Sequence, residues 1–316
     1  MVDRPNKPTA LAATPGLPPQ AQVTISDDNA RVTALLPTGE SVEVLLFGAT
    51  VLSWKDAAGD EKLWLSEASK LDGSKGVRGG IPIVFPLFGP PNADHPATAK
   101  LPQHGFARTA RWEYLGKSTS EGSSSSVKLD FGLSSENLDD ATRAAWPCKF
   151  GLLYSVTLDR ESLNTTLVVS NQGDESFDLQ TLLHTYFRVK DISSVQISGL
   201  EDSSYVDKVD GAKAKMEAST PVTLSGEADR VYTPAKGPAH PVIVSDGGQP
   251  RFRIVRDNLD QIVVWNPWTE KVEGMSDFVP KSGYKNMVCV EAGSVKGWQK
   301  LDKGDTFEAA QTIFLS

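Results

Sequence analysis

The chain has 316 residues, of which 39% are hydrophobic, and it carries a formal net charge of −8 at pH 7. This length fits one or two domains, and the hydrophobic content is sufficient for a large core. The acidic balance and the absence of a basic run argue against nucleic-acid partners. No apolar run approaches the roughly 18 residues of a membrane-spanning helix, so no membrane association is expected.

The two cysteines, Cys148 and Cys289, show no metal-ligand spacing. They fit a reducing cytosol, although a single disulfide between them is also compatible with the sequence. The N-terminus has neither the apolar region of a secretory signal nor the arginine content of a transit peptide. The sequence therefore predicts a cytoplasmic protein without a bound metal, and we expect a monomer.

In chain order, residues 1–20 are rich in Pro and Ala and have no hydrophobic period, as in a mobile tail. From residue 21 onwards, short runs of β-branched and aromatic residues alternate with turn-forming residues, which is typical of antiparallel hairpins. Strands are predicted at Gln22–Ile25, Ala30–Leu36, Ser41–Phe47, Val51–Trp54, Arg111–Leu115, Val127–Leu133, Leu152–Leu158, Leu163–Val169, Thr181–Arg188, Ser194–Ile197, Arg251–Arg256, Gln261–Trp265, Met287–Glu291 and Thr306–Phe314.

Helical signals are few. Glu136–Ala145 is the best helix candidate, and Glu121–Ser126 is expected to be a flexible hairpin tip. No repeat or domain-scale linker is visible. The sequence therefore predicts one all-β domain over residues 21–316, a large antiparallel β-sandwich of two sheets packed face to face with few short helices.

Residues 66–108 interrupt the rhythm of strands. Their central part, Gly73–Pro91, is dense in Gly and Pro but also apolar, which argues for an ordered functional loop rather than disorder. Arg78 lies in this loop beside Gly79 and Gly80, which would allow the backbone to approach a ligand closely. Arg108 lies in the following loop, and arginine forks suit phosphate or carboxylate oxygens. Either arginine is equally compatible with an exposed surface.

Strand Thr181–Arg188 places one histidine in an unusual setting. Side chains of a strand alternate between two faces, and the odd-numbered residues from Phe177 to Phe187 fit a core. The other face is polar and aromatic, which suits the floor of a binding cleft. It carries Asp178, Gln180, Leu182, His184, Tyr186 and Arg188. His184 is therefore a catalytic candidate, with a structural histidine as the alternative.

Glu291 stands at the end of the apolar strand Met287–Glu291. A carboxylate there is costly to bury unless it is paired, and burial raises its pKa towards that of a proton acceptor at neutral pH. An exposed glutamate at the end of a strand is the alternative. Asp229 is by default a turn residue that can also accept a sugar hydroxyl.

Other aromatic and histidine residues have weaker signals. Trp265 and Trp268 have flat faces that suit sugar rings, although core packing is the commoner use of tryptophan. His104 either contacts a ligand or braces its loop. His95 and His240 lie in Pro-rich loops and are expected to be exposed to solvent.

Seven segments together resemble the hexose-6-phosphate mutarotases, the glucose-6-phosphate 1-epimerase branch of the aldose 1-epimerase superfamily. The resemblance begins near residue 30 and keeps one order to the C-terminus. The segments are Val77–Gly89, Leu101–Thr109, Trp112–Glu113, Leu183–Phe187, Asp229–Tyr232, Val264–Trp268 and Glu291–Gly293.

The resemblance implies a galactose-mutarotase-like supersandwich and a cofactor-free enzyme that interconverts the anomers of D-glucose 6-phosphate. By motif match it implies His184 and Glu291 as catalytic residues. It places sugar-phosphate contacts on Arg78, Gln103, Arg108 and Asp229. The chemistry agrees, because anomerisation needs one base for the C1 hydroxyl and one acid for the ring oxygen, without a redox or metal step. His104 and Trp265 complete the expected substrate site.

Three alternative functions remain at this point. One is a mutarotase for unphosphorylated aldoses such as galactose. Another is a non-catalytic sugar-binding module in which Trp265 and Trp268 form a stacking platform. The third is a glycosidase, which needs two carboxylates across the scissile bond, and Asp229 and Glu291 are the only pair on offer.

Overall fold

The structure is a computed structural model that describes residues 19–91, 94–118 and 126–316. The expected tail at residues 1–20 lies outside this part of the chain except for its last two residues. The expected hairpin tip at Glu121–Ser126 also lies outside it, except for Ser126. Within the described ranges, no helix combines the length and apolar character needed to cross a membrane.

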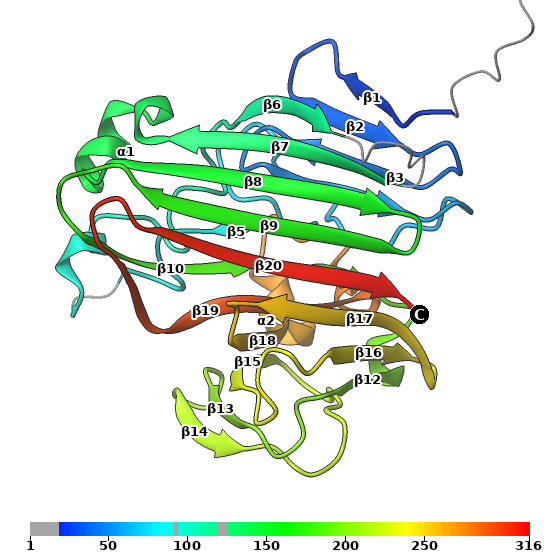
Figure 1. Cartoon of the computed structure of the whole chain (residues 1–316). Helices are drawn as coiled ribbons and strands as arrows, with labels where there is room; N and C mark the ends of the chain where they lie inside the picture. The colour runs from blue at the N-terminus through cyan, green and yellow to red at the C-terminus, as the bar shows by residue number, and fades with distance from the viewer. Residues whose placement is uncertain (1–18, 92–93, 119–125) are drawn as a thin grey trace, which may run out of the picture.

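The described residues form two eight-stranded sheets and one four-stranded sheet, and the paired strands are antiparallel (Figure 1). The four-stranded sheet contains, in sequence order, β1 (Gln22–Ile25), β2 (Arg31–Leu35), β3 (Ser41–Leu45) and β4 (Thr50–Lys55). The front sheet of Figure 1 has the order β12 (Val195–Ser198), β16 (Val242–Asp246), β17 (Gln249–Asp257), β20 (Thr306–Leu315), β9 (Ser162–Asn171), β8 (Phe150–Asp159), β7 (Ser126–Ser134) and β6 (Glu113–Ser118).

The back sheet carries the site described below. Its order is β14 (Lys213–Met216), β13 (Ser204–Asp207), β15 (Ala228–Thr233), β18 (Gln261–Asn266), β19 (Met287–Leu301), β10 (Phe177–Leu183) and β5 (Ile83–Val84), and β11 (Tyr186–Arg188) also pairs with β19. The helices are short: α1 (Asp140–Ala145), α2 (Trp268–Glu273) and the 3-10 turns Pro96–Thr98, Ser135–Asn137, Ile192–Ser194 and Lys281–Asn286.

Strand periodicity explains how the sheets pack. In β7 and β9 every second residue is buried and the residues between are partly exposed, as in sheets with one face on the core. β18 is buried at all positions, because one face lies on the main core and the other on a second apolar cluster that includes Val272 of α2. The predicted all-β sandwich is confirmed, with a four-stranded sheet in addition to the two large sheets that were expected.

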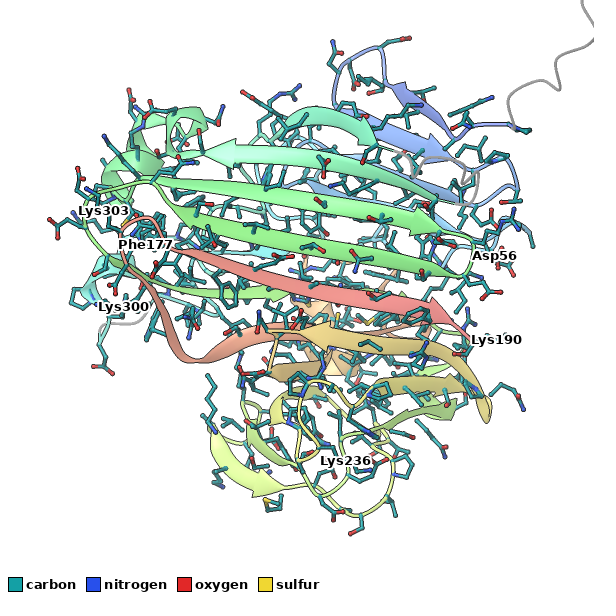
Figure 2. All side chains as sticks on the ribbon, in the orientation of Figure 1. Asp56, Phe177, Lys190, Lys236, Lys300 and Lys303 are labelled. Carbon is teal, nitrogen blue, oxygen red and sulfur yellow. The ribbon has the colours of Figure 1, made fainter. Side chains whose placement is uncertain are left out.

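The long strands run between the two ends of the molecule. Lys300 and Lys303 lie at one end, and Asp56 and Lys190 lie at the opposite end (Figure 2).

Several local predictions were wrong. The expected helix Glu136–Ala145 starts only at Asp140, because Asp139 caps it by accepting a hydrogen bond from the Thr142 backbone N–H at 2.8 Å. No strand was predicted at β5, β13, β14, β15 or β16, which are short. Asp229 lies inside β15 rather than in a turn.

The expected exposure of His95 and His240 was also wrong, since both are half-buried. The His95 ring stacks on Trp298 at 3.6 Å between centroids, and its Nε2 lies 3.1 Å from Asp178 Oδ2. The Pro-rich loop therefore folds back onto β10 and β19 instead of extending into solvent.

Candidate active site

A cavity of about 380 Å³ lies on the face of the back sheet that points away from the front sheet. Cross-strand register assembles its floor, because Asp229 pairs with Trp265 and Trp265 with Cys289, while Val263 pairs with Glu291. Residues opposite one another on neighbouring strands point to the same face. The lining residues are Arg78, Phe88, Gly89, Pro90, Gln103, His104, His184, Lys208, Asp229, Val263, Trp265, Lys271, Met275 and Glu291.

Glu291 is one of the most deeply buried carboxyl groups of the described chain, with 2% of its surface exposed. Burial, reinforced by the negative charge of Asp229, raises the pKa of the Glu291 carboxyl well above its ordinary value, and Lys208 opposes this shift. The alternative of an exposed strand-end glutamate is thereby excluded. A buried carboxyl group with a raised pKa, facing a cavity, is suited to proton transfer.

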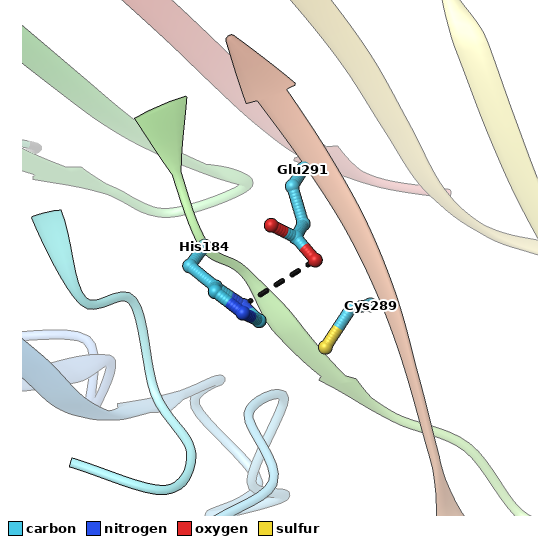
Figure 3. A group of neighbouring side chains, drawn as sticks. All are labelled: His184, Cys289 and Glu291. Atoms are coloured by element: carbon cyan, nitrogen blue, oxygen red, sulfur yellow. Dashed lines mark ion pairs between the residues drawn. The ribbon is translucent and has the colours of Figure 1, made fainter. Parts of the chain in front are cut away.

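His184 lies beside this carboxyl group, with its Nδ1 3.5 Å from Glu291 Oε1 (Figure 3). That distance is longer than a strong hydrogen bond, as is common for catalytic pairs without substrate. Burial lowers the pKa of His184 well below its ordinary value, and the positive charges of Arg78 and Arg108 add to the shift. Both shifts favour the uncharged form of each partner, and the two groups titrate as a coupled pair.

The strand that carries His184 is interrupted, contrary to the continuous strand Thr181–Arg188 expected from the sequence. His184 and Thr185 lie between β10 and β11. The His184 backbone N–H donates to Pro82 O at 3.0 Å, and the next two N–H groups donate to Leu183 O and Gly80 O, both at 2.9 Å. The loop thus replaces a neighbouring strand as the hydrogen-bond partner of the His184 and Tyr186 N–H groups. The predicted alternation of buried and partly exposed residues holds only from Phe177 to Thr181, because Leu182 and Tyr186, which were expected on the polar face, are both buried.

Gly79 and Gly80 have a different role from the one expected. Both have positive φ, and a Cβ on Gly80 would lie 2.1 Å from Val51 O, while one on Gly79 would lie 2.4 Å from Trp64 O. These glycines permit close packing of the loop on the chain's own backbone rather than on a ligand. Their effect on the site is indirect, because the loop they allow holds the strand break at His184.

Tyr186 connects the histidine to an arginine. Its ring stacks on the His184 imidazole at 4.7 Å between centroids with an interplanar angle of 8°. Its hydroxyl accepts a hydrogen bond from Arg78 Nη1 at 3.1 Å, and Arg78 Nη2 pairs with Asp277 Oδ2 at 3.1 Å. Burial opposes the charged form of Arg78, but the hydrogen bonds to Tyr186 and Asp277 and the negative charge of Asp277 outweigh it and raise the pKa of Arg78. The arginine is therefore fixed in place as a permanent cation.

Arg108 lines a second cavity of about 270 Å³ that adjoins the first, with Arg78 and Gln103 common to both. Lys75 and Asp277 also line it. Within residues 19–91, 94–118 and 126–316, the Arg108 guanidinium has no carboxylate within 4.0 Å, and its Nη2 donates to Gln103 O at 2.7 Å. Burial and the charge of Arg78 lower the pKa of Arg108. This small cavity is therefore suited to an anion.

His104 both braces its loop and faces the cavity. Its Nδ1 accepts a hydrogen bond from the Gly89 backbone N–H at 3.2 Å, so in the neutral ring Nε2 carries the proton. Burial, with the charges of Arg108, Lys208 and Arg78, lowers the pKa of His104 to about 3. It is a neutral donor at physiological pH.

Trp265 lines the cavity, but Trp268 does not. Trp268 instead packs at the start of α2 against Tyr284, with 5.5 Å between the ring centroids. The two tryptophans therefore do not form the shared stacking platform that a simple sugar-binding module would need.

Lys208 was missed by the sequence reasoning. It directly follows β13, and its Nζ lies 3.6 Å from Asp229 Oδ1 and 3.9 Å from the centre of the Phe88 ring. Its segment, Asp207–Gly211, reads as a solvated turn, so nothing in the sequence marked it. Asp277 and Tyr186 were missed as site residues for a similar reason, because their partners are distant in the chain.

The sequence of this chain is similar to those of several known proteins. A sequence profile described as aldose 1-epimerase matches residues 32–313. An Escherichia coli protein named "Putative glucose-6-phosphate 1-epimerase" is 34% identical over 269 residues, covering 85% of this chain and 84% of its own. A Cenchrus ciliaris protein of the same name is 32% identical over 257 residues, covering 80% of this chain and 75% of its own.

Solved structures agree with these matches. The crystal structure of a Salmonella typhimurium protein described as a "putative mutarotase" has a TM-score of 0.79 and 30% identity, covering 95% of both chains. A galactose mutarotase related enzyme from Lactobacillus acidophilus, at 18% identity, shares the fold with a TM-score of 0.67 over 94% of this chain and 97% of its own.

Proposed function

The chain belongs to the aldose 1-epimerase family, and on that premise we propose that it interconverts the α and β anomers of D-glucose 6-phosphate. The observation that carries the proposal is the pair of joined cavities. One contains the buried pair His184 and Glu291, and the other contains Arg108, with Arg78 between them. A sugar ring in the first cavity can extend its 6-phosphate into the second.

In the proposed mechanism, Glu291 accepts the proton of the C1 hydroxyl while His184 protonates the ring oxygen. The C1–O5 bond then opens and C1 becomes an aldehyde. Rotation about the C1–C2 bond presents the other face of the aldehyde to the C5 hydroxyl, and ring closure returns both protons with the roles exchanged. Each cycle leaves the enzyme as it began, without a redox change and without a cofactor.

The proposed roles require the single proton of the pair to lie on His184 when ring opening begins. Without substrate, burial favours the state in which this proton lies on the Glu291 carboxyl group. The 3.5 Å separation of Nδ1 and Oε1 supports transfer of that proton within the pair once substrate closes the gap. The active form is therefore the one with one proton shared by two residues.

Substrate contacts are proposed for the remaining lining residues. Arg78 and Arg108 bind the phosphate, with Gln103 between the two cavities. Asp229 accepts a ring hydroxyl, His104 donates through Nε2, and Trp265 faces the sugar. Lys208 joins this set because it lines the same cavity and neutralises Asp229.

We propose that the enzyme is a cytoplasmic monomer and that residues 21–316 form one domain. Free thiols at Cys148 and Cys289 support a reducing compartment. One apolar cluster extends from Ala21 to Ile313, which supports a single domain. Light scattering of the purified protein tests the monomer directly.

The function is tested with Glu291→Gln and His184→Asn, measured by NMR exchange between the anomers of glucose 6-phosphate. Each change removes one proton-transfer group, and we expect a loss of about 100-fold or more. Circular dichroism controls for folding. A folded variant with near wild-type exchange would remove that residue from the mechanism. Faster exchange on free galactose than on glucose 6-phosphate would favour an aldose mutarotase instead.

A further inference from the structure

Cys289 is a buried thiol for which anomerisation has no use. It lies two residues before Glu291 on β19, so the two side chains point to the same face, and His184 approaches them from the strand break (Figure 3). One ligand atom from each of the three residues lies within 4.8 Å of the other two. The cluster thus brings a sulfur, a nitrogen and an oxygen donor to one point.

We propose that His184, Cys289 and Glu291 form a binding site for a thiophilic divalent cation, with Zn²⁺ and Cd²⁺ as its chemical class, and that the bound ion inhibits the enzyme. The binding site stands on geometry alone, whereas the inhibition rests on the proposed function, since it requires His184 and Glu291 to be the proton-transfer pair.

The distances suit a small tetrahedral ion. Zinc bonds of about 2.3 Å to sulfur and about 2.0 Å to nitrogen or oxygen place ligand atoms roughly 3.3–3.6 Å apart. His184 Nδ1 and Glu291 Oε1 are already 3.5 Å apart. The sulfur lies within 4.8 Å of both atoms and must approach by about 1.2 Å at most, which side-chain rotation provides. His184 Nδ1 is buried and without a hydrogen-bond partner among the described residues, so it is available as a ligand.

The donor set selects against magnesium and calcium. These ions need six or more oxygen ligands, whereas the cluster offers one carboxylate. Sulfur and imidazole ligands favour zinc and cadmium. Three protein ligands leave the fourth position open towards the cavity, where water completes the coordination.

Charge sets the strength of the site. Binding transfers the thiol proton and the carboxyl proton to solvent, and the resulting thiolate and carboxylate neutralise the two positive charges of the ion. Arg78 and Lys208 lie close enough to influence Cys289 and Glu291 and oppose a further cation. The ion therefore binds reversibly, and it competes with substrate because it occupies both proton-transfer groups.

The test uses the full chain freed of metal with EDTA, titrated with ZnCl₂ while anomer exchange is followed. Cys289→Ala removes the sulfur without touching the proposed reaction, and Cys148→Ala is the matched control at the other free cysteine. We expect wild type and Cys148→Ala to be inhibited at the same zinc concentration, with reversal by EDTA. Cys289→Ala should need about 10-fold more zinc or higher, because one ligand is lost.

A second readout does not depend on activity. Cd²⁺ bound to a thiolate gives an ultraviolet charge-transfer band, which is expected in wild type and Cys148→Ala and absent in Cys289→Ala. Equal zinc sensitivity of wild type and Cys289→Ala, or no cadmium band in wild type, would overturn the site. If the protein does not accelerate anomer exchange but shows the cadmium charge-transfer band, the proposed function fails and the metal site stands.

Discussion

Replacing Arg108 with alanine separates phosphate recognition from sugar recognition. The guanidinium is half-buried, has no carboxylate within 4.0 Å among the described residues, and its pKa is lowered by burial and Arg78. A phosphate would supply the missing counter-charge. Hydrogen bonds to charged groups contribute about 1.5–3 kcal/mol, so kcat/KM for glucose 6-phosphate should fall roughly 10- to 150-fold. Exchange of free glucose should change little.

The assay compares both sugars for wild type, Arg108→Ala, Arg108→Lys and Arg111→Ala. Arg111 is the matched control, because its guanidinium donates to Asn29 O and lies over Phe47, outside both cavities. Arg108→Lys keeps the charge but loses the planar fork and should lie between wild type and alanine. If Arg108→Ala slows glucose and glucose 6-phosphate equally, the second cavity is not the phosphate site.

Three further predictions follow from the same geometry. The pH–rate profile should be a bell in which His184 governs the acid limb, by taking up a second proton below its ordinary pKa of 6.5, and Glu291 governs the alkaline limb, by losing the only one above its ordinary pKa of 4.5. An NMR titration in which Glu291 titrates at the acid limb and His184 at the alkaline limb would contradict the buried pair. Tyr186→Phe keeps the ring on His184 but removes the acceptor of Arg78, so KM for glucose 6-phosphate should rise by about 2- to 12-fold with kcat nearly unchanged; kinetics in which kcat falls and KM holds would refute this. Gly80→Ala should lower the free energy of unfolding by more than about 2 kcal/mol in urea titration, because its Cβ would lie 2.1 Å from Val51 O at φ +65°. Gly226→Ala is the control and should be nearly neutral, because there is open space around Gly226. Equal stability of the two variants would contradict the packing.

The sandwich was accessible from sequence because period-2 alternation is strong in long strands such as β7 and β9. The catalytic pair was accessible in part for the same reason. Strand patterning placed His184 on a polar face and Glu291 at an apolar strand, and the family resemblance joined them. Their 3.5 Å separation was beyond reach, since it depends on the pairing of β10, β11 and β19.

The misses have one physical cause, which is tertiary contact overriding local chemistry. The break at His184 follows from backbone bonds to Gly80 and Pro82, which no local pattern encodes. Lys208 sits in a segment typical of a solvated turn but points into the cavity, and Asp277 gains its role only by meeting Arg78. The sequence around His95 is typical of an exposed loop, but in the structure its ring stacks on Trp298.

The hydroxyl of Ser66 contacts a segment more than 200 positions later in the chain. It donates to Asp277 O at 2.7 Å and accepts from the Val279 N–H at 2.8 Å. The loop that carries Arg78 and the aspartate that orients this arginine, Asp277, therefore come together only after almost all of the polypeptide is in place. Contacts of such long sequence separation form late and carry a high closure entropy. Enzymatic turnover should consequently report completion of the whole fold, and partly folded or truncated chains should be inert even where most of the sandwich has formed.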